Sequence, residues 1–381
     1  MLYIPPKRTK SYQMPTKVYF GRAILKTISN IVQPLGVKRI LLVTGEHFKS
    51  STDYKHVVQQ LNKEYNLVIF NKAIRKSNFS TVNSLANFCR GKGFDTVIAI
   101  GGGAILDVSK SAAILAMNEG KVEDFLKKKR SILNKGLKMI AIPTTAGTGS
   151  EVTPWATIWG EDGKKYSLSS NKYMFPYIAM DDPEITDGLS PKITAESGID
   201  ALCQSIEAYW NINHNPISDK YALKSIKLII SSLEKAVIYG NKKYRNQMML
   251  GSLLGGLSFS NTQTTICHAI SYPITIHWNI NHGQATSITL PLFIKQIFPL
   301  LPKSRLKKLL HILEANNHSD ASSKIETLMS NIGLKTKLSE LGIKKNEISL
   351  IVKESLGQSR LSNSPMIPQP SELEKLLVTI F

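Results

Sequence analysis

Two histidines, His268 and His282, stand fourteen residues apart on either side of Pro273. Upstream, Asp200 and Gln204 are spaced i, i+4, so they share one face of a helix. Imidazole and carboxylate ligands suit iron and zinc, and an amide oxygen also binds divalent ions. The four side chains are therefore candidate ligands of one divalent metal.

The residue types leave structural alternatives open. An aspartate such as Asp200 can cap a helix or pair with a cation, and a histidine such as His268 can be a satisfied core residue. A third histidine, His277, falls in the same stretch and competes for the ligand role. The position of His282 directly before Gly283 favours the metal interpretation.

Two glycine-rich turns precede this region, each directly after a strand-like run. Glycines let the backbone approach a pyrophosphate, and a helix N-terminus adds free amides and a positive dipole. Such turns at successive strand ends predict a dinucleotide site. A dinucleotide beside a metal favours hydride transfer to or from a carbonyl. The candidate contacts are Gly101, Gly102, Gly103, Asp107, Lys110, Thr144, Thr145, Thr148 and Ser150, with Lys165 a short loop later.

Hydrophobic periodicity divides the chain in two. Strand-like runs over 39–44, 66–70, 95–100 and 138–143 alternate with helical patterns over 52–64, 80–92 and 104–118. This alternation predicts an α/β, Rossmann-like, doubly wound parallel sheet over residues 1–183. Residues 184–381 show mostly helical periodicity, for example over 193–210, 216–239 and 243–261, and predict an all-α domain for metal and substrate.

Composition excludes several classes of protein. No run of 18 or more uncharged apolar residues occurs, so no membrane span is expected. The start, MLYIPPKRTK, lacks a signal-peptide core, and three widely spaced cysteines read as free thiols, so we expect a cytoplasmic protein. The formal charge is +20, but the lysine clusters at 127–130 and 303–308 are short and lack interleaved aromatics. They predict solvated faces and no nucleic-acid partner.

Together these motifs resemble the iron-containing (group III) alcohol dehydrogenases along nearly the whole chain. The resemblance implies the fold that this family shares with dehydroquinate synthase, a nicotinamide cofactor, a metal such as iron or zinc, and a homodimer. The family's ligands, one aspartate and three histidines, fall on Asp200, Gln204, His268 and His282. Gln204 departs from the family histidine, and an amide oxygen binds iron or zinc more weakly than imidazole.

Two further departures bear on cofactor and catalysis. Gly45 stands where many NAD-preferring relatives carry an aspartate that bonds the ribose and repels a 2′-phosphate. The resemblance therefore implies that NADP(H) is accepted as well as NAD(H). Tyr272 stands where many relatives have a histidine that relays a proton near the nicotinamide. We expect Tyr272 in the catalytic site, with the proton arriving through water or a ribose hydroxyl.

Four shorter segments, 153–159, 164–168, 207–210 and 268–273, resemble the phosphonoacetaldehyde reductases of that family. This finer resemblance implies reduction of phosphonoacetaldehyde to 2-hydroxyethylphosphonate in phosphonate biosynthesis. A phosphonate dianion needs a cationic or donor-rich pocket. The candidate partners are Lys165, His277 and Arg360, with Asn261 and Asn363 as neutral donors.

Four alternatives stay open. The chain could act on another small aldehyde or alcohol, of the butanol or lactaldehyde type. A dehydroquinate synthase-like lyase would keep the fold but carries a different metal motif. A nucleotide-binding protein with lost catalysis would explain Gln204, and a nucleic-acid binder would explain the basic charge.

Overall fold

The computed structural model describes residues 2–3, 10–74 and 76–381. The chain divides into two compact units. The sheet unit comprises Met14–Gly188, and the helical unit comprises Leu189–Phe381 together with the described residues up to Gln13. Each unit is described by itself.

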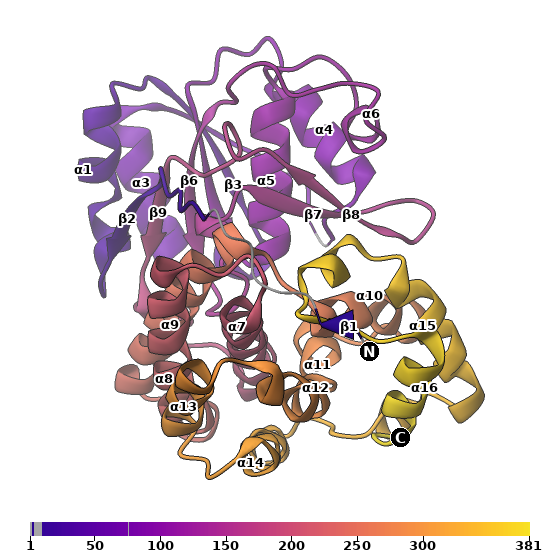
Figure 1. Ribbon diagram of the computed structural model, residues 1–381. Coiled ribbons are helices and arrows are strands. Elements are labelled where there is room, and N and C mark those ends of the chain that lie inside the picture. Colours follow the sequence, from indigo (N-terminus) through magenta and orange to yellow (C-terminus); the bar gives the residue numbers. More distant parts are fainter. Residues whose placement is uncertain (1, 4–9, 75) are drawn as a thin grey trace. The chain divides into compact units, whose positions relative to one another are not determined.

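The sheet unit is built on six parallel strands in the order β2-β9-β6-β5-β3-β4 (Figure 1). This confirms the predicted doubly wound parallel sheet, and the four expected strands match β3, β4, β5 and β6. The sequence missed β2 and β9, which are only four residues long. The bounds are β2 (Lys17–Phe20), β3 (Arg39–Thr44), β4 (Asn66–Ile69), β5 (Thr96–Gly101), β6 (Lys138–Pro143) and β9 (Ile178–Asp181).

Helices cover both faces of the sheet, which explains why its central strands are continuously apolar. Along β3, Ile40 and Leu42 pack on the side of α1 (Ile28–Val32) and α3 (Thr52–Glu64). Leu41 and Val43 face the other side, where α4 (Phe79–Cys89) and α5 (Gly103–Leu115) pack. Successive side chains of this strand therefore alternate between two hydrophobic cores.

A two-stranded hairpin follows the second glycine-rich turn. Its strands are β7 (Trp155–Trp159) and β8 (Lys165–Ser169), and they pair antiparallel with Trp159 opposite Lys165. The Nζ atom of Lys165 lies 5.4 Å from the centroid of the Trp159 ring. The hairpin therefore determines where Lys165 stands.

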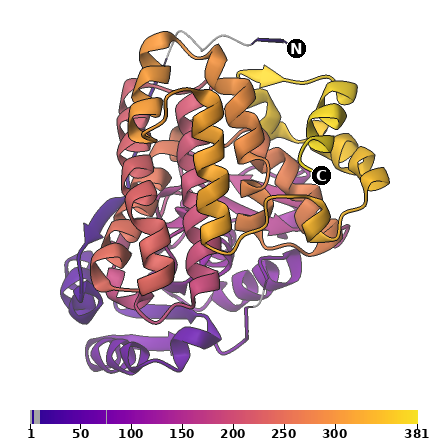
Figure 2. The same ribbon diagram turned by 90° about the horizontal axis from the view of Figure 1, so that it is seen from below.

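Three long helices, α7 (Pro191–Trp210), α8 (Pro216–Tyr239) and α9 (Lys242–Thr262), pack together in the helical unit (Figure 1 and Figure 2). They match the three expected helical segments. Each begins at a side-chain cap, Ser190, Asn215 or Asn241, which accepts a hydrogen bond from the first turn. The later helices are α10 (Ile266–Trp278), α11 (His282–Ser287), α12 (Leu290–Ile297), α13 (Lys303–Ile312), α14 (His318–Asn331), α15 (Ile348–Leu356) and α16 (Pro370–Val378).

The N-terminal segment differs from the sequence-based division, which assigned residues 1–183 to one domain. The hydroxyl of Tyr12 donates to the carbonyl of Leu257 at 2.9 Å, and the backbone N–H of Gln13 donates to Asn261 Oδ1 at 2.7 Å. Asn215 also donates to the carbonyl of Ser11. These bonds tie residues 11–13 to α8 and α9, and so to the helical unit.

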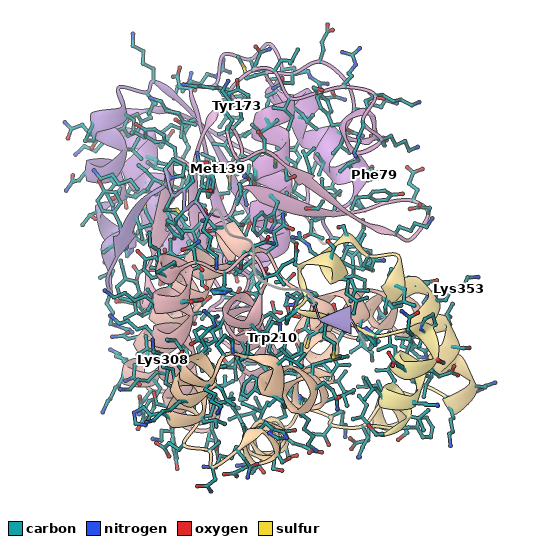
Figure 3. The ribbon with its side chains drawn as sticks, viewed as in Figure 1. Phe79, Met139, Tyr173, Trp210, Lys308 and Lys353 are labelled. Carbon is teal, nitrogen blue, oxygen red and sulfur yellow. The ribbon has the colours of Figure 1, made fainter. Side chains whose placement is uncertain are left out.

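Surface and core follow the expected polarity. The lysines at 127–129 and at 303, 307 and 308 are exposed, in agreement with solvated faces. Figure 3 labels Lys308 and Lys353, which are exposed, and Trp210 and Met139, which are buried in their units. Among the described helices, none is both long and apolar enough to span a membrane.

Candidate functional site

Three predicted ligands converge in the helical unit. Asp200 lies on α7, His268 on α10 and His282 at the start of α11. One potential ligand atom from each lies within 4.8 Å of the others, and Asp200 Oδ1 is 3.5 Å from His268 Nε2. Asp200 and His268 are buried, whereas His282 is half-buried. The geometry suits a divalent cation bound by one carboxylate and two imidazoles.

Gln204 is linked to this cluster through Asp200. Its Nε2 donates to Asp200 Oδ2 at 2.8 Å, which leaves its carbonyl oxygen as the group to be satisfied. That Oε1 atom is buried and accepts no hydrogen bond within the described part of the chain. A buried acceptor without a donor costs about 1–3 kcal/mol. A divalent cation would satisfy it, so the residues present fit a metal although the expected histidine is replaced.

Glu207 positions His268 from behind. This fully buried carboxylate accepts hydrogen bonds from the Thr265 hydroxyl at 2.8 Å and the Cys267 backbone N–H at 2.7 Å. It also makes a short hydrogen bond with Nδ1 of His268. With Nδ1 held, the other ring nitrogen, Nε2, is directed toward Asp200, as in many metal-binding histidines.

The sequence analysis did not assign Glu207 to the site. The available signal was its spacing, because Asp200, Gln204 and Glu207 stand at i, i+4 and i+7 on one helical face. A buried acid at that spacing needs a partner from another element. His268 is that partner.

The electrostatics of the cluster favour a positive charge at His268. Burial lowers the pKa of this imidazole, but the charge of Glu207 and the bond to Asp200 outweigh burial and raise it to about 9. Burial raises the pKa of Glu207, yet His268 and Thr265 bring it below its ordinary value. A metal bound at Nε2 would take the place of a proton.

The start of α11 is held tightly against α7. A Cβ atom on Gly283 would lie 1.9 Å from the carbonyl oxygen of Glu196, so only glycine fits after His282. Asn281 donates to the Glu196 carboxylate at 2.8 Å. Tyr272 stacks on the His282 ring with centroids 6.4 Å apart, which places it beside the cluster as expected.

His277 has a different partner. Its Nε2 lies 3.0 Å from both carboxylate oxygens of Glu354 on α15, and its side chain is exposed. The expectation that His277 competes as a metal ligand or holds a phosphonate is therefore corrected, because this nitrogen is engaged by the Glu354 carboxylate at the surface.

The amide candidates for the phosphonate are also engaged. Asn261 exchanges hydrogen bonds with the backbone of Gln13, so it holds the N-terminal segment rather than a substrate. Asn363 donates to Gln263 Oε1 at 3.2 Å and to the Thr264 carbonyl at 3.1 Å. Arg360 is 8% exposed in a 3-10 turn that packs against α10. Of these three, Arg360 stays a candidate.

In the sheet unit, three strands end at one level. Thr44 of β3 pairs with Ile100 of β5, and Gly101 of β5 pairs with Pro143 of β6. The chain order of the strands reverses between β3 and β5, and nucleotides bind beyond the carboxyl ends of strands at such a point. Gly45 and both glycine-rich turns follow these three strand ends directly.

Packing explains two of the three glycines after β5. A Cβ atom on Gly101 would lie 2.5 Å from Ile105 Cγ1, and one on Gly103 would lie 2.7 Å from Thr148 Cγ2. The turns after β5 and β6 therefore touch each other at Gly103 and Thr148, and neither Gly101 nor Gly103 has room for a side chain. Within these two turns, five predicted cofactor contacts keep some exposure and stay candidates: Gly102, Gly103, Thr144, Thr145 and Thr148.

Lys110 and Asp107 support the turn instead of facing a ligand. Lys110 is 2% exposed, and its Nζ donates to the carbonyls of Ser150 at 2.7 Å and Trp155 at 2.7 Å. Asp107 accepts from Ser150 Oγ at 2.6 Å and from the Thr157 backbone N–H at 2.8 Å. The expectation that Lys110 reaches a phosphate is corrected, because its ammonium is enclosed by the turn's own oxygens.

Comparisons with known proteins agree with this geometry. Residues 15–183 match the family described as "Iron-containing alcohol dehydrogenase", and residues 194–381 match "Fe-containing alcohol dehydrogenase family, C-terminal". Long-chain-alcohol dehydrogenase 1 of Geobacillus thermodenitrificans is 33% identical over 365 residues, 92% of each chain. Sulfoacetaldehyde reductase of Bilophila wadsworthia is 28% identical over 96% of this chain and 97% of its own. The crystal structure of sulfoacetaldehyde reductase from Bifidobacterium kashiwanohense in complex with NAD+ has a TM-score of 0.91 and 30% identity, and covers 98% of this chain and 99% of its own.

We predict one divalent metal per chain at Asp200, Gln204, His268 and His282. Gln204→His should retain iron or zinc against about tenfold more chelator, because imidazole replaces an amide oxygen. His268→Ala should lose the metal. Elemental analysis after chelator dialysis measures both effects.

His277→Ala is the matched control, since His277 shares α10 with His268 but pairs with Glu354. It should bind metal like the unaltered protein. Equal metal retention in His268→Ala and His277→Ala would contradict this ligand set.

Proposed function

Because the chain belongs to the iron-containing alcohol dehydrogenase family, we propose that it reduces phosphonoacetaldehyde to 2-hydroxyethylphosphonate. At the coarser level it is a nicotinamide-dependent alcohol dehydrogenase or aldehyde reductase that uses NAD(H) or NADP(H) and a divalent metal such as iron. The proposal concerns the aldehyde, the residues that handle it and its place in phosphonate biosynthesis.

The observation that carries the substrate proposal is the similarity to two sulfoacetaldehyde reductases. Sulfoacetaldehyde and phosphonoacetaldehyde share one skeleton, an aldehyde next to a carbon that bears a tetrahedral oxyanion. Such a substrate is drawn to a basic protein, and the formal charge here is +20. The four segments that resemble phosphonoacetaldehyde reductases favour the phosphonate over the sulfonate.

The first part of the proposal concerns the metal and the side chains around it. A metal held by Asp200, Gln204, His268 and His282 would supply Lewis-acid polarisation of the aldehyde oxygen. Glu207 keeps His268 in one tautomer, with Nε2 directed toward the cluster. Tyr272, stacked on His282, is the proposed proton-handling side chain.

On the cofactor side, the two turns are proposed to bind the pyrophosphate. The free amides at the start of α5 point to the carboxyl edge of the sheet and favour anions. Reduced nicotinamide would supply the hydride when bound. Lys110 and Asp107 hold the second turn in its conformation, so they would influence cofactor binding only through that turn.

Lys165 and Arg360 are the proposed cationic partners of the phosphonate. Lys165 is half-buried on β8, and its charge acts to lower the pKa of Asp107 near the glycine-rich turns. A role at the cofactor is therefore the competing assignment. The two assignments differ in how the enzyme handles an uncharged aldehyde.

A second candidate function is oxidation and reduction of uncharged alcohols and aldehydes. The 33% identity to a long-chain-alcohol dehydrogenase favours it. The homodimer, the cytoplasmic location and the functional roles assigned to residues 1–183 and 184–381 stay predictions.

We predict that NADPH or NADH oxidation is fastest with phosphonoacetaldehyde. Steady-state assays with phosphonoacetaldehyde, sulfoacetaldehyde, acetaldehyde and butanal measure kcat/KM for each. A tenfold preference for an uncharged aldehyde, about 1.4 kcal/mol of transition-state binding, would sink the substrate proposal. A tenfold preference for sulfoacetaldehyde would replace the phosphonate with a sulfonate in the proposal but keep the class of anionic aldehydes.

We predict that Gly45→Asp shifts cofactor preference toward NADH. Gly45 has a φ of −79°, and a Cβ atom there would lie 3.7 Å from Ile105, an ordinary contact, so the side chain fits. The new carboxylate would bond the ribose and repel a 2′-phosphate. The measurement is the ratio of kcat/KM for the two cofactors, with Gly45→Asn as an uncharged control. An unchanged ratio would mean that position 45 does not face the ribose.

We predict that Lys165→Ala impairs phosphonoacetaldehyde reduction by about 2 kcal/mol, roughly thirtyfold, and acetaldehyde reduction much less. The reason is loss of a charge-assisted contact to the phosphonate. Lys164→Ala is the matched control, because the side chain of Lys164 is 75% exposed. An equal loss on both aldehydes would assign Lys165 to the cofactor.

A further inference from the structure

Two acidic side chains lie buried beneath the second glycine-rich turn. Glu151 is 2% exposed in the 3-10 turn Ser150–Val152, which packs against β6, β9 and α5. Asp181 is 0% exposed at the end of β9. Ala179 of β9 pairs with Ala141 of β6, so Asp181 stands level with Pro143, where the turn begins. The pair therefore lies between the sheet and the turn.

Asp181 lacks the donors that its neighbour has. Asp182 accepts backbone N–H bonds from Ala23, Leu25 and Glu184 at 2.9–3.0 Å. Neither carboxylate oxygen of Asp181 accepts a hydrogen bond from any residue that the structure describes. An ionised carboxylate in that position is costly, so a proton is the donor that the geometry leaves available.

The surrounding charged groups do not supply the donor that Asp181 lacks. Lys110 is committed to the carbonyls of Ser150, Thr153 and Trp155. Burial raises the pKa of Asp181 well above its ordinary value, and the charge of Glu151 raises it further. Burial also raises the pKa of Glu151 to about 7, where Lys110 lowers it and Asp107 raises it.

We propose that Glu151 and Asp181 together keep one proton and thereby position the turn for the cofactor pyrophosphate. They are positioning residues, since they act through the turn and touch no ligand. Loss of the proton places a second negative charge beneath the phosphates and drives the two carboxylates apart. The inference rests on the proposed function in one respect, namely that this turn binds the dinucleotide.

The sign of the stability effect follows from the raised pKa values. A carboxyl whose pKa is raised on folding contributes its full stability below the unfolded value of about 4. That contribution is lost as the pH rises through the folded value, about 7 for Glu151. Above neutral pH the pair therefore costs stability, and a neutral isostere should remove the cost.

The experiment compares the full-length protein with Asp181→Asn between pH 6.5 and 8.5. In the unaltered protein, the melting temperature should fall with rising pH and the Kd for NADPH should rise about tenfold. In Asp181→Asn, the melting temperature should be higher at pH 8.5 and the Kd should change less than threefold. Lys110, whose pKa burial lowers to about 8, titrates in both proteins, so the difference between them isolates Asp181.

Glu119→Gln, 93% exposed in the same unit, is the charge-matched control and should behave like the unaltered protein. Glu151→Gln tests the partner carboxyl. Calorimetry of the unaltered protein in two buffers of different ionisation enthalpy should show proton uptake on NADPH binding at pH 8, and this needs no variant to fold.

Absence of proton uptake, or parallel pH profiles for the unaltered protein and Asp181→Asn, would overturn the inference while dinucleotide binding stands. Absence of NADPH and NADH binding at every pH would instead contradict the proposed function and remove the premise of the inference.

Discussion

The hydrogen bond between Glu207 and Nδ1 of His268 joins α7 to α10, and the candidate metal cluster depends on it. The same carboxylate accepts from Thr265 and from the Cys267 backbone, so it fixes the start of α10 as well as the ring. Without this anchor the imidazole could rotate away from Asp200. A buried acid is tolerated here because each of its oxygens has a donor.

The two glycine-rich turns of the sheet unit are also held in place by buried contacts. Gly103 leaves no space for a side chain, so Thr148 of the turn after β6 packs directly on it. From α5, Lys110 then donates to the Ser150 carbonyl and Asp107 accepts from the Ser150 hydroxyl, while the outer side of the turn keeps only small or hydroxyl residues. The proposed anion binding would therefore rely on backbone amides, while Lys110 holds the turn in place.

The sequence predicted the elements with strong periodicity and the residues whose chemistry is visible in one segment. Strands such as 39–44 and helices such as 216–239 carry their own pattern, and Asp200 with His268 and His282 form a recognisable set. The sequence did not show which polar side chains are buried or which partners they bond. Lys110 and His277 look available in the sequence, but one is enclosed by carbonyls and the other is paired with Glu354. β9 was missed, although it is no shorter than the predicted β4, and with it the buried Asp181.

Gln204 shows how a departure from a family pattern can preserve a site. A ligand at this position has to offer a lone pair to the cation and leave Asp200 ionised. The amide does the first with Oε1, which otherwise stays unsatisfied, and the second with Nε2, which donates to Asp200 Oδ2. Thr286 donates to the other oxygen of Asp200 at 3.2 Å, so that carboxylate is held as an acceptor on both sides. In the proposed metal site, Gln204 would therefore exchange a nitrogen ligand for a harder oxygen ligand and keep the charge of the cluster, which would move its preference toward ions that accept mixed oxygen and nitrogen donors.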